Sequence, residues 1–87
     1  MTLVIAYHEV DDREHWLASP KREEVLASFG VSLKRTFIDP ESANRVAILV
    51  DVPDIGSLPS MMQSPEVGEA MAHDGVRPDT VVMLVEA

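Results

Sequence analysis

The sequence of 87 residues contains no cysteine, so it has neither a disulfide staple nor a thiol nucleophile. Basic residues are also scarce: seven Lys and Arg stand against fifteen Asp and Glu, and the formal net charge is −8. A general nucleic-acid-binding protein needs a basic face, and an anionic membrane surface repels an acidic chain. We therefore expect no nucleic acid and no membrane among the partners.

Long apolar runs and phosphate-binding glycine loops are missing as well. The apolar run 3–7 is too short for the hydrophobic region of a signal peptide and has no basic residue before it. No run approaches the length of a transmembrane helix. These absences predict a cytoplasmic protein and argue against nucleotide-dependent chemistry.

A chain of this length is expected to form one domain, residues 1–87, with a small core. The free energy gained by burying apolar surface and the conformational entropy lost on folding are both about 130 kcal/mol. Because the two terms cancel, a lone monomer is expected to be marginally stable. A second copy that shares the core would stabilise it.

Four segments rich in β-branched residues predict strands, and two segments between them predict helices. The strands are expected at 3–10, 31–38, 46–52 and 80–86, and the helical regions at 11–29 and 58–73. Each helical region contains a Ser-Pro pair, Ser19-Pro20 or Ser64-Pro65, which is typical of a helix start. We therefore expect each region to be two helical segments or one kinked helix.

The two halves of the chain resemble each other. Six identities align the first half with the second: Ser19, Pro20, Glu24, Ala27, Gly30 and Val31 fall on Ser64, Pro65, Glu69, Ala72, Gly75 and Val76. A duplicated βαβ unit would keep residues at such structural positions. Two units in tandem predict a ferredoxin-like α+β sandwich, in which an antiparallel four-stranded sheet of order 4-1-3-2 carries both helical regions on one face.

The expected strands 3–10, 46–52 and 80–86 are apolar on successive residues rather than alternating. Such strands are buried on both faces, whereas two helical regions cover only one face of the sheet. The simplest cover for the other face is a second copy of the same sheet, so we expect a homodimer through the sheet faces. The alternative is a monomer with one exposed apolar face, which is uncommon.

The βαββαβ order, the length and the doubly apolar sheet resemble the dimeric α+β barrel superfamily. That superfamily includes antibiotic-biosynthesis monooxygenases, polyketide cyclases, muconolactone isomerases and haem-degrading enzymes. Asp12-x-x-x-Trp16, a basic residue at Arg22, and Gly30-Val31 resemble a subgroup of small uncharacterised proteins within it, as do Ser64-Pro65-Glu66 and Gly75-Val76. The resemblance implies a ferredoxin-like fold, a dimer and a ligand pocket between helices and sheet.

The predicted topology brings His8, His15 and His73 to one end of the molecule. Histidine titrates near neutral pH, so these three are the candidate catalytic acids or bases. Tyr7, Trp16 and Arg35 are the candidate ligand-binding residues: the two aromatic side chains as pocket walls and the arginine as an anion-binding group. Each histidine also has a structural explanation, for example His73 at a helix C-terminus.

No cofactor and no metal are expected. The spacing of His8, Asp12, His15 and His73 matches no strong metal signature, and acidic residues at a helix start have a simple electrostatic explanation. The haem-degrading members of the superfamily combine a histidine on the last helix with an asparagine on the first strand and a tryptophan on the second helix. The last two are missing here. Four methionines can be either core or the walls of an adaptable pocket: Met61, Met62, Met71 and Met83.

The sequence thus predicts a small-ligand-binding domain for an apolar or carbonyl compound. The candidate activities are those of a cofactor-independent cyclase, isomerase or monooxygenase. The alternative is a non-catalytic ligand-binding or assembly protein of the same fold. An enzyme is expected to have a closed apolar cavity that at least one histidine enters.

Overall fold

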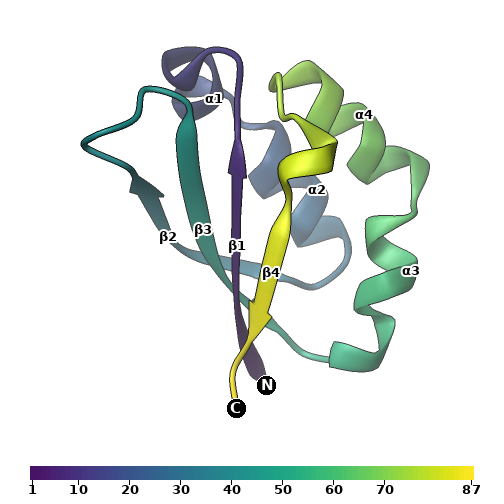
Figure 1. Cartoon of the computed structure of the whole chain (residues 1–87). Helices are drawn as coiled ribbons and strands as arrows, with labels where there is room; N and C mark the ends of the chain where they lie inside the picture. Colours follow the sequence, from purple (N-terminus) through teal and green to yellow (C-terminus); the bar gives the residue numbers. More distant parts are fainter.

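The computed structural model describes all residues from 1 to 87 and shows an antiparallel sheet with helices on one face (Figure 1). The strands have the spatial order β2-β3-β1-β4, which is the expected order read from the other edge. The elements in chain order are β1 (Thr2–Glu9), α1 (Arg13–Ala18), α2 (Lys21–Ser28), β2 (Ser32–Ile38), β3 (Arg45–Val52), the 3₁₀ turn η1 (Ile55–Ser57), α3 (Leu58–Met62), α4 (Pro65–His73), the 3₁₀ turn η2 (Pro78–Thr80) and β4 (Val82–Val85).

Both helical regions are divided at their Ser-Pro pairs, as the sequence predicted. Ser64 caps α4 by accepting a hydrogen bond from the Val67 amide, and Pro65 occupies the first helical position. At the other pair, Ser19 ends α1 and its hydroxyl accepts a hydrogen bond from the Lys21 amide.

The internal repeat of the sequence corresponds to a repeated hydrogen bond at the ends of α2 and α4. Val31 N–H donates to Leu26 C=O at 3.0 Å, and Val76 N–H donates to Met71 C=O at 2.9 Å, at the same offset as the sequence identities. Between these groups, Gly30 and Gly75 have positive φ angles of 77° and 71°. The two glycines therefore end α2 and α4 with the same left-handed turn, which a β-carbon would strain.

The last strand is shorter than expected. Thr80, expected to begin the strand, instead ends the turn η2, because Pro78 favours a turn and the Thr80 hydroxyl donates to the Arg77 carbonyl at 2.6 Å. The strand begins only at Val82 and pairs with β1.

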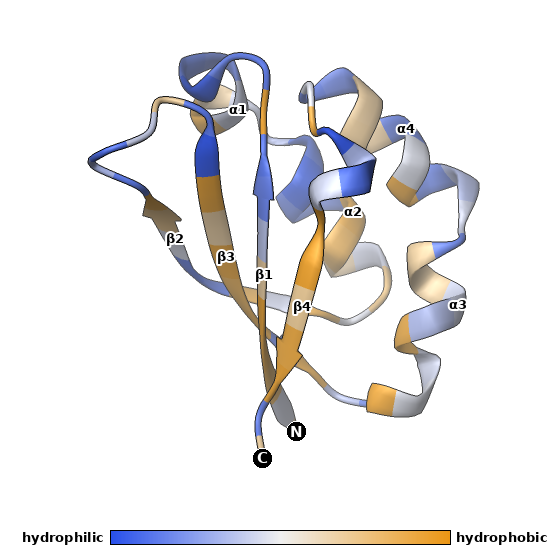
Figure 2. Ribbon diagram, viewed as in Figure 1, coloured by the Kyte–Doolittle hydropathy of each residue, from blue (hydrophilic) through white to orange (hydrophobic).

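The two faces of the sheet have different neighbours. Val4, Ala6 and His8 of β1 are buried beneath the helices, and Trp16 of α1 is only 1% exposed. The intervening Ile5 and Tyr7 lie on the outer face, which no element covers. Figure 2 shows that β3 and β4 are hydrophobic over much of their length. None of the helices is long and apolar enough to cross a membrane.

Candidate functional site

A cavity of about 100 Å³ lies between the sheet and the helices. Residues of β1, β3, β4 and all four helices line it, and sixteen of the nineteen lining residues are hydrophobic. The other three are His8, Arg22 and Asp74. An apolar cavity with so few polar groups is typical of a small-molecule site.

His8 is held at the end of β1 on the inner face of the sheet. Its side chain is buried, and its ring meets the edge of Trp16 at a centroid distance of 5.7 Å and an interplanar angle of 72°. Its Nε2 atom is buried and has no hydrogen-bond partner. Burial lowers the pKa of His8 from its ordinary value of 6.5, and the positive charge of Arg22 lowers this pKa further. His8 is therefore a neutral imidazole at neutral pH.

Arg22, in the first turn of α2, also contacts the Trp16 ring. Its Cζ atom is 4.0 Å from the centroid of the indole, a cation–π distance, and its Nη1 donates to the Trp16 carbonyl at 2.7 Å. Its Nε atom is buried without a partner. Burial lowers the pKa of Arg22, whereas the carboxylates of Asp74 and Glu23 act in the opposite direction. The guanidinium stays charged, since its ordinary pKa is far above neutrality.

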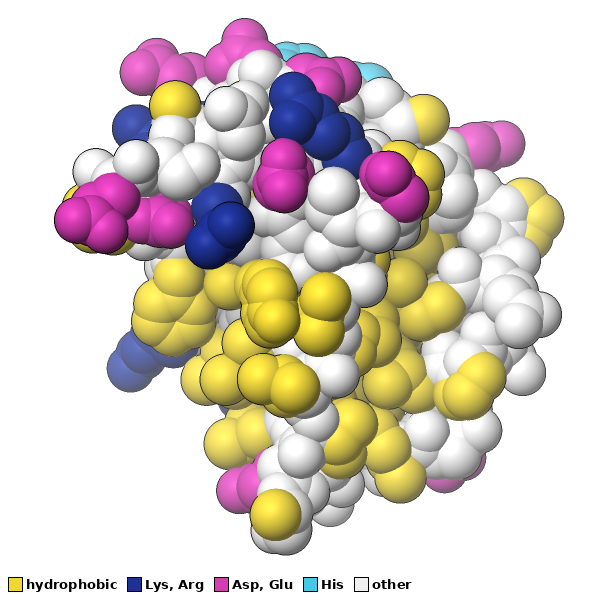
Figure 3. Space-filling view, viewed as in Figure 1, with side chains coloured by type: hydrophobic (Ala, Val, Ile, Leu, Met, Phe, Trp, Pro, Cys, Tyr) yellow, Lys and Arg dark blue, Asp and Glu magenta, His cyan; other side chains and the backbone are white.

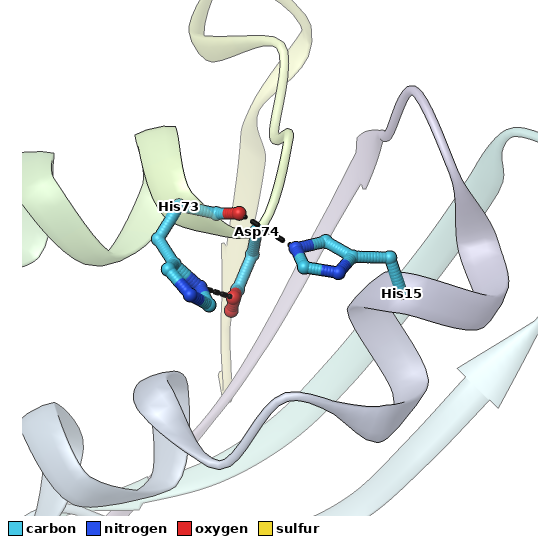
Figure 4. Close-up of side chains that lie close together, drawn as sticks. All are labelled: His15, His73 and Asp74. Carbon is cyan, nitrogen blue, oxygen red and sulfur yellow. Dashed lines mark hydrogen bonds and ion pairs between the residues drawn. The ribbon is translucent and has the colours of Figure 1, made fainter.

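Asp74, at the end of α4, is almost completely buried and is bound by His73, whose backbone carbonyl is in turn bound by His15 (Figure 4). His73 Nδ1 donates to Asp74 Oδ1 at 2.9 Å, and His15 Nε2 donates to the His73 carbonyl at 2.8 Å. The rings of His15 and His73 are 5.3 Å apart. This arrangement joins the first helical region to the end of α4 and fixes the carboxylate beside the cavity.

The same three side chains are the ones that could hold a metal ion. One ligand atom from each of His15, His73 and Asp74 lies within 4.8 Å of the others. However, His73 Nδ1 and Asp74 Oδ1 bind each other, and His15 Nε2 already has the His73 carbonyl as its partner. A cation would have to replace these hydrogen bonds, so the cluster is best explained as a structural clamp.

The structure brings two of the predicted site residues together at the cavity, His8 and Trp16. His15 and His73 lie at the same end of the molecule, as expected, but both are exposed and neither lines the cavity. Of the three histidines, only His8 can meet a ligand bound between sheet and helices.

Tyr7 and Arg35, predicted as ligand-binding residues, lie away from this cavity on the outer face of the sheet. Tyr7 precedes His8 in β1, and adjacent residues of a strand point to opposite faces. Arg35 pairs with Leu49 on the outer face, after a bulge at Lys34 that separates it from the inward-facing Leu33.

Two residues of the site were missed by sequence reasoning, Arg22 and Asp74. Arg22 is six positions after Trp16 and beyond a helix break, so no helical spacing joins them. Asp74 follows α4 in the Asp-Gly pair, where it reads as a stop signal. Only the packing of α2 against α4, with Arg22 over Trp16, brings both side chains to the cavity.

A pH titration tests the buried state of His8. Since the pKa of His8 is lower in the folded than in the unfolded protein, the unfolded chain binds the proton more readily, and stability rises with pH. The contribution is complete above pH 6.5 and is lost as the pH falls below that value. Between about pH 7.5 and about pH 5.5, the free energy of unfolding should fall more for the wild type than for His8→Gln.

Urea unfolding at a series of pH values measures this difference. His15 and His73 remain in both proteins, so their titration cancels in the comparison. Parallel pH curves for the two proteins would show that His8 is not protected from protonation in the folded state.

The structure defines a ferredoxin-like α+β domain, which is the fold expected from the sequence, and its apolar cavity is partly open to the surface rather than closed. Over its whole length the chain is similar to the crystal structure of an antibiotic biosynthesis monooxygenase, with a TM-score of 0.63 and 13% sequence identity. The alignment covers 100% of this chain and 97% of that chain. At this identity the likeness shows the fold alone. No model of a protein family matches the sequence, and no curated protein matches it.

Proposed function

We propose that the protein binds a small apolar molecule in the cavity between sheet and helices. The observation that carries this proposal is an almost entirely hydrophobic cavity, partly open to the surface, whose few polar groups include a histidine with a buried Nε2 atom that has no partner. Empty apolar space costs free energy, because the lining atoms lose their dispersion contacts, and a ligand restores them. The fold of the similar monooxygenase is consistent with this use.

For the catalytic form of this function, His8 is the residue we assign as acid or base. A neutral, buried imidazole next to a cavity can remove a proton from a bound compound without any cofactor. This chemistry suits an isomerase, a cyclase or a cofactor-independent monooxygenase. A non-catalytic ligand-binding protein would need the cavity but not His8, so the second candidate function predicts that His8→Gln retains the function.

We further propose that the working unit is a homodimer joined through the outer sheet faces. Large apolar side chains on that face are strongly exposed, as seen over the strands in Figure 3: Ile5, Tyr7, Phe37, Val82 and Leu84. A patch of this kind is uncommon on a monomer. A second copy is the occupant that fits best, since it would offer the same apolar patch in return.

Charge complementarity on this face supports a second copy. Asp51 has a buried carboxylate oxygen without a hydrogen-bond partner, and Arg35 has an exposed guanidinium whose only bond is a long one to the Lys34 carbonyl. Both residues lie on the outer face, on neighbouring strands. In a symmetric dimer, Arg35 of one copy can form an ion pair with Asp51 of the other copy, and symmetry gives two such pairs.

Filling the cavity tests the binding function. Ala70→Leu places three more carbon atoms at a lining position of α4, and we expect it to weaken ligand binding about tenfold or more, a loss of about 1.4 kcal/mol. Trp16 is the only tryptophan and lines the cavity, so its fluorescence reports binding directly. The control is Ala27→Leu, the same change at an exposed position of α2. Equal binding by the two variants would place the ligand elsewhere.

A further inference from the structure

The polar end of the cavity contains two nitrogen atoms that no group of the protein satisfies, His8 Nε2 and Arg22 Nε. Both side chains contact Trp16, whose ring is 5.7 Å from the His8 ring and 4.0 Å from the Arg22 guanidinium carbon. Leaving a buried polar group unpaired costs about 1–3 kcal/mol, and more when it is charged. A ligand oxygen at this end of the cavity would accept a hydrogen bond from Arg22 Nε–H and recover the part of that free energy that belongs to the arginine, while the lone pair of His8 Nε2 stays free to accept a proton.

The charges at this end determine what kind of oxygen fits. Arg22 carries a positive charge, on which the carboxylates of Asp74 and Glu23 both act, and His8 is neutral. Of the two carboxylates, only Asp74 lines the cavity. The charges of the three polar residues that line the cavity, Arg22, Asp74 and His8, sum to zero, so a neutral ligand leaves the site neutral. A carboxylate ligand would add an uncompensated negative charge beside Asp74, which is 1% exposed. The charges therefore favour a neutral oxygen acceptor over a carboxylate, and a carbonyl oxygen is the neutral acceptor that can also take up negative charge during a reaction.

The volume of the cavity determines the size of the ligand. A cavity of about 150 Å³ holds one benzene molecule. At about 100 Å³, this cavity holds a five-membered ring or a short chain, with some adaptability from the methionine side chains in its walls.

We propose that the cavity is a site for a small, neutral carbonyl compound with a hydrogen on the carbon next to the carbonyl. In this assignment Arg22 is a catalytic residue beside His8: Arg22 Nε–H binds the carbonyl oxygen and His8 Nε2 removes the neighbouring proton. This inference rests on the proposed binding function and adds the substrate class and the role of Arg22.

The step balances without any cofactor. The C–H bond breaks, its proton forms an N–H bond with the lone pair of His8 Nε2, and its electron pair moves to the oxygen to give an enolate. Arg22 stabilises this negative charge, which is present in the transition state but not in the ketone. Return of a proton from His8 to the original carbon completes a hydrogen exchange, and its return to the oxygen, which gives the enol, completes an isomerisation. The site therefore binds the transition state more strongly than the substrate.

Hydrogen exchange of cyclopentanone in D₂O tests the proposal. The wild type should speed the exchange of the hydrogens next to the carbonyl, followed by ¹H NMR. His8→Gln should slow this exchange by about 100-fold or more, as expected for loss of a general base. Arg22→Met should slow it by a similar factor, and Arg22→Lys, which restores the charge, should recover part of the rate. Lys21→Met, at the exposed neighbouring position, should have no effect.

Two ligands of matched shape separate this proposal from the binding function. Methylenecyclopentane replaces the carbonyl oxygen by CH₂, and cyclopentanecarboxylate carries a charge; both should bind at least about tenfold more weakly than cyclopentanone. Exchange no faster than in buffer, equal rates for Arg22→Met and wild type, or equal binding of the hydrocarbon would each overturn the proposal. Those results leave the binding function intact if the hydrocarbon binds. Failure of all three ligands to bind would overturn the binding function itself.

Discussion

Replacing Trp16 by alanine is expected to destabilise the protein by about 3–5 kcal/mol, a large part of the stability of a domain this small. The indole is 1% exposed and forms the contact between β1 and the first helical region. Removal of the indole leaves a cavity that opens into the existing one. The same substitution removes the aromatic ring that the Arg22 guanidinium contacts.

Urea denaturation measures this effect. Leu17→Ala, a neighbouring large-to-small change at a side chain that is 44% exposed, is the control and should cost less than about 1 kcal/mol. Comparable losses for both variants would mean that Trp16 is not the centre of the packing.

Leu84→Lys is expected to convert the proposed dimer to monomers. Leu84 is 55% exposed in one chain and lies on the outer face opposite Ile5 of β1. In a symmetric interface the substitution introduces two buried charges. If each of the two lysines costs about 2 kcal/mol of the free energy of association, the dissociation constant of the dimer rises about a thousand-fold.

Sedimentation equilibrium of both proteins over a range of concentrations gives this constant. Leu17→Lys is the matched control, since it places the same charge at a similarly exposed leucine of α1. A wild type that sediments as a monomer at micromolar concentration, or a Leu84→Lys protein as dimeric as the wild type, would rule out the sheet-to-sheet dimer.

The fold was predictable because its signals are local and repeated. The Ser-Pro pairs divide both helical regions, and the glycines after them carry the same pair of hydrogen bonds at the same offset. Strand order followed from the tandem βαβ units and from the apolar character of the central strands. The last strand was overestimated because Val81 and Thr80 are good strand residues, whereas Pro78 and the Thr80 hydroxyl favour a turn.

The site was predictable only in part, because it depends on which face each side chain occupies. His8 and Trp16 were found through their types and their places at the end of β1 and the start of α1. Tyr7 could have been assigned to the other face from strand alternation alone. Arg35 could not, since a single extra residue at Lys34 decides its face, and bulges have no reliable signal in one sequence.

The remaining site residues required tertiary structure. A charged residue is normally exposed, so nothing in the sequence indicates that Asp74 is buried or that Arg22 lies against an indole. Their roles come from α2 and α4, which pack against each other and bring both side chains to the cavity. The polar residues of this cavity are therefore determined by how the helices pack, and no local sequence motif identifies them.

Methyl NMR of the five methionines tests the central claim, that the cavity binds a small ligand, most directly. Four of them line the cavity: Met61, Met62, Met71 and Met83. Met1 is 86% exposed at the chain end and serves as an internal control. Titration of [¹³C-methyl]methionine-labelled protein with cyclopentanone should shift the four cavity signals along one saturable curve and leave Met1 in place. Cavity signals that stay unmoved at saturating ligand, or that drift no more than Met1, would contradict the account.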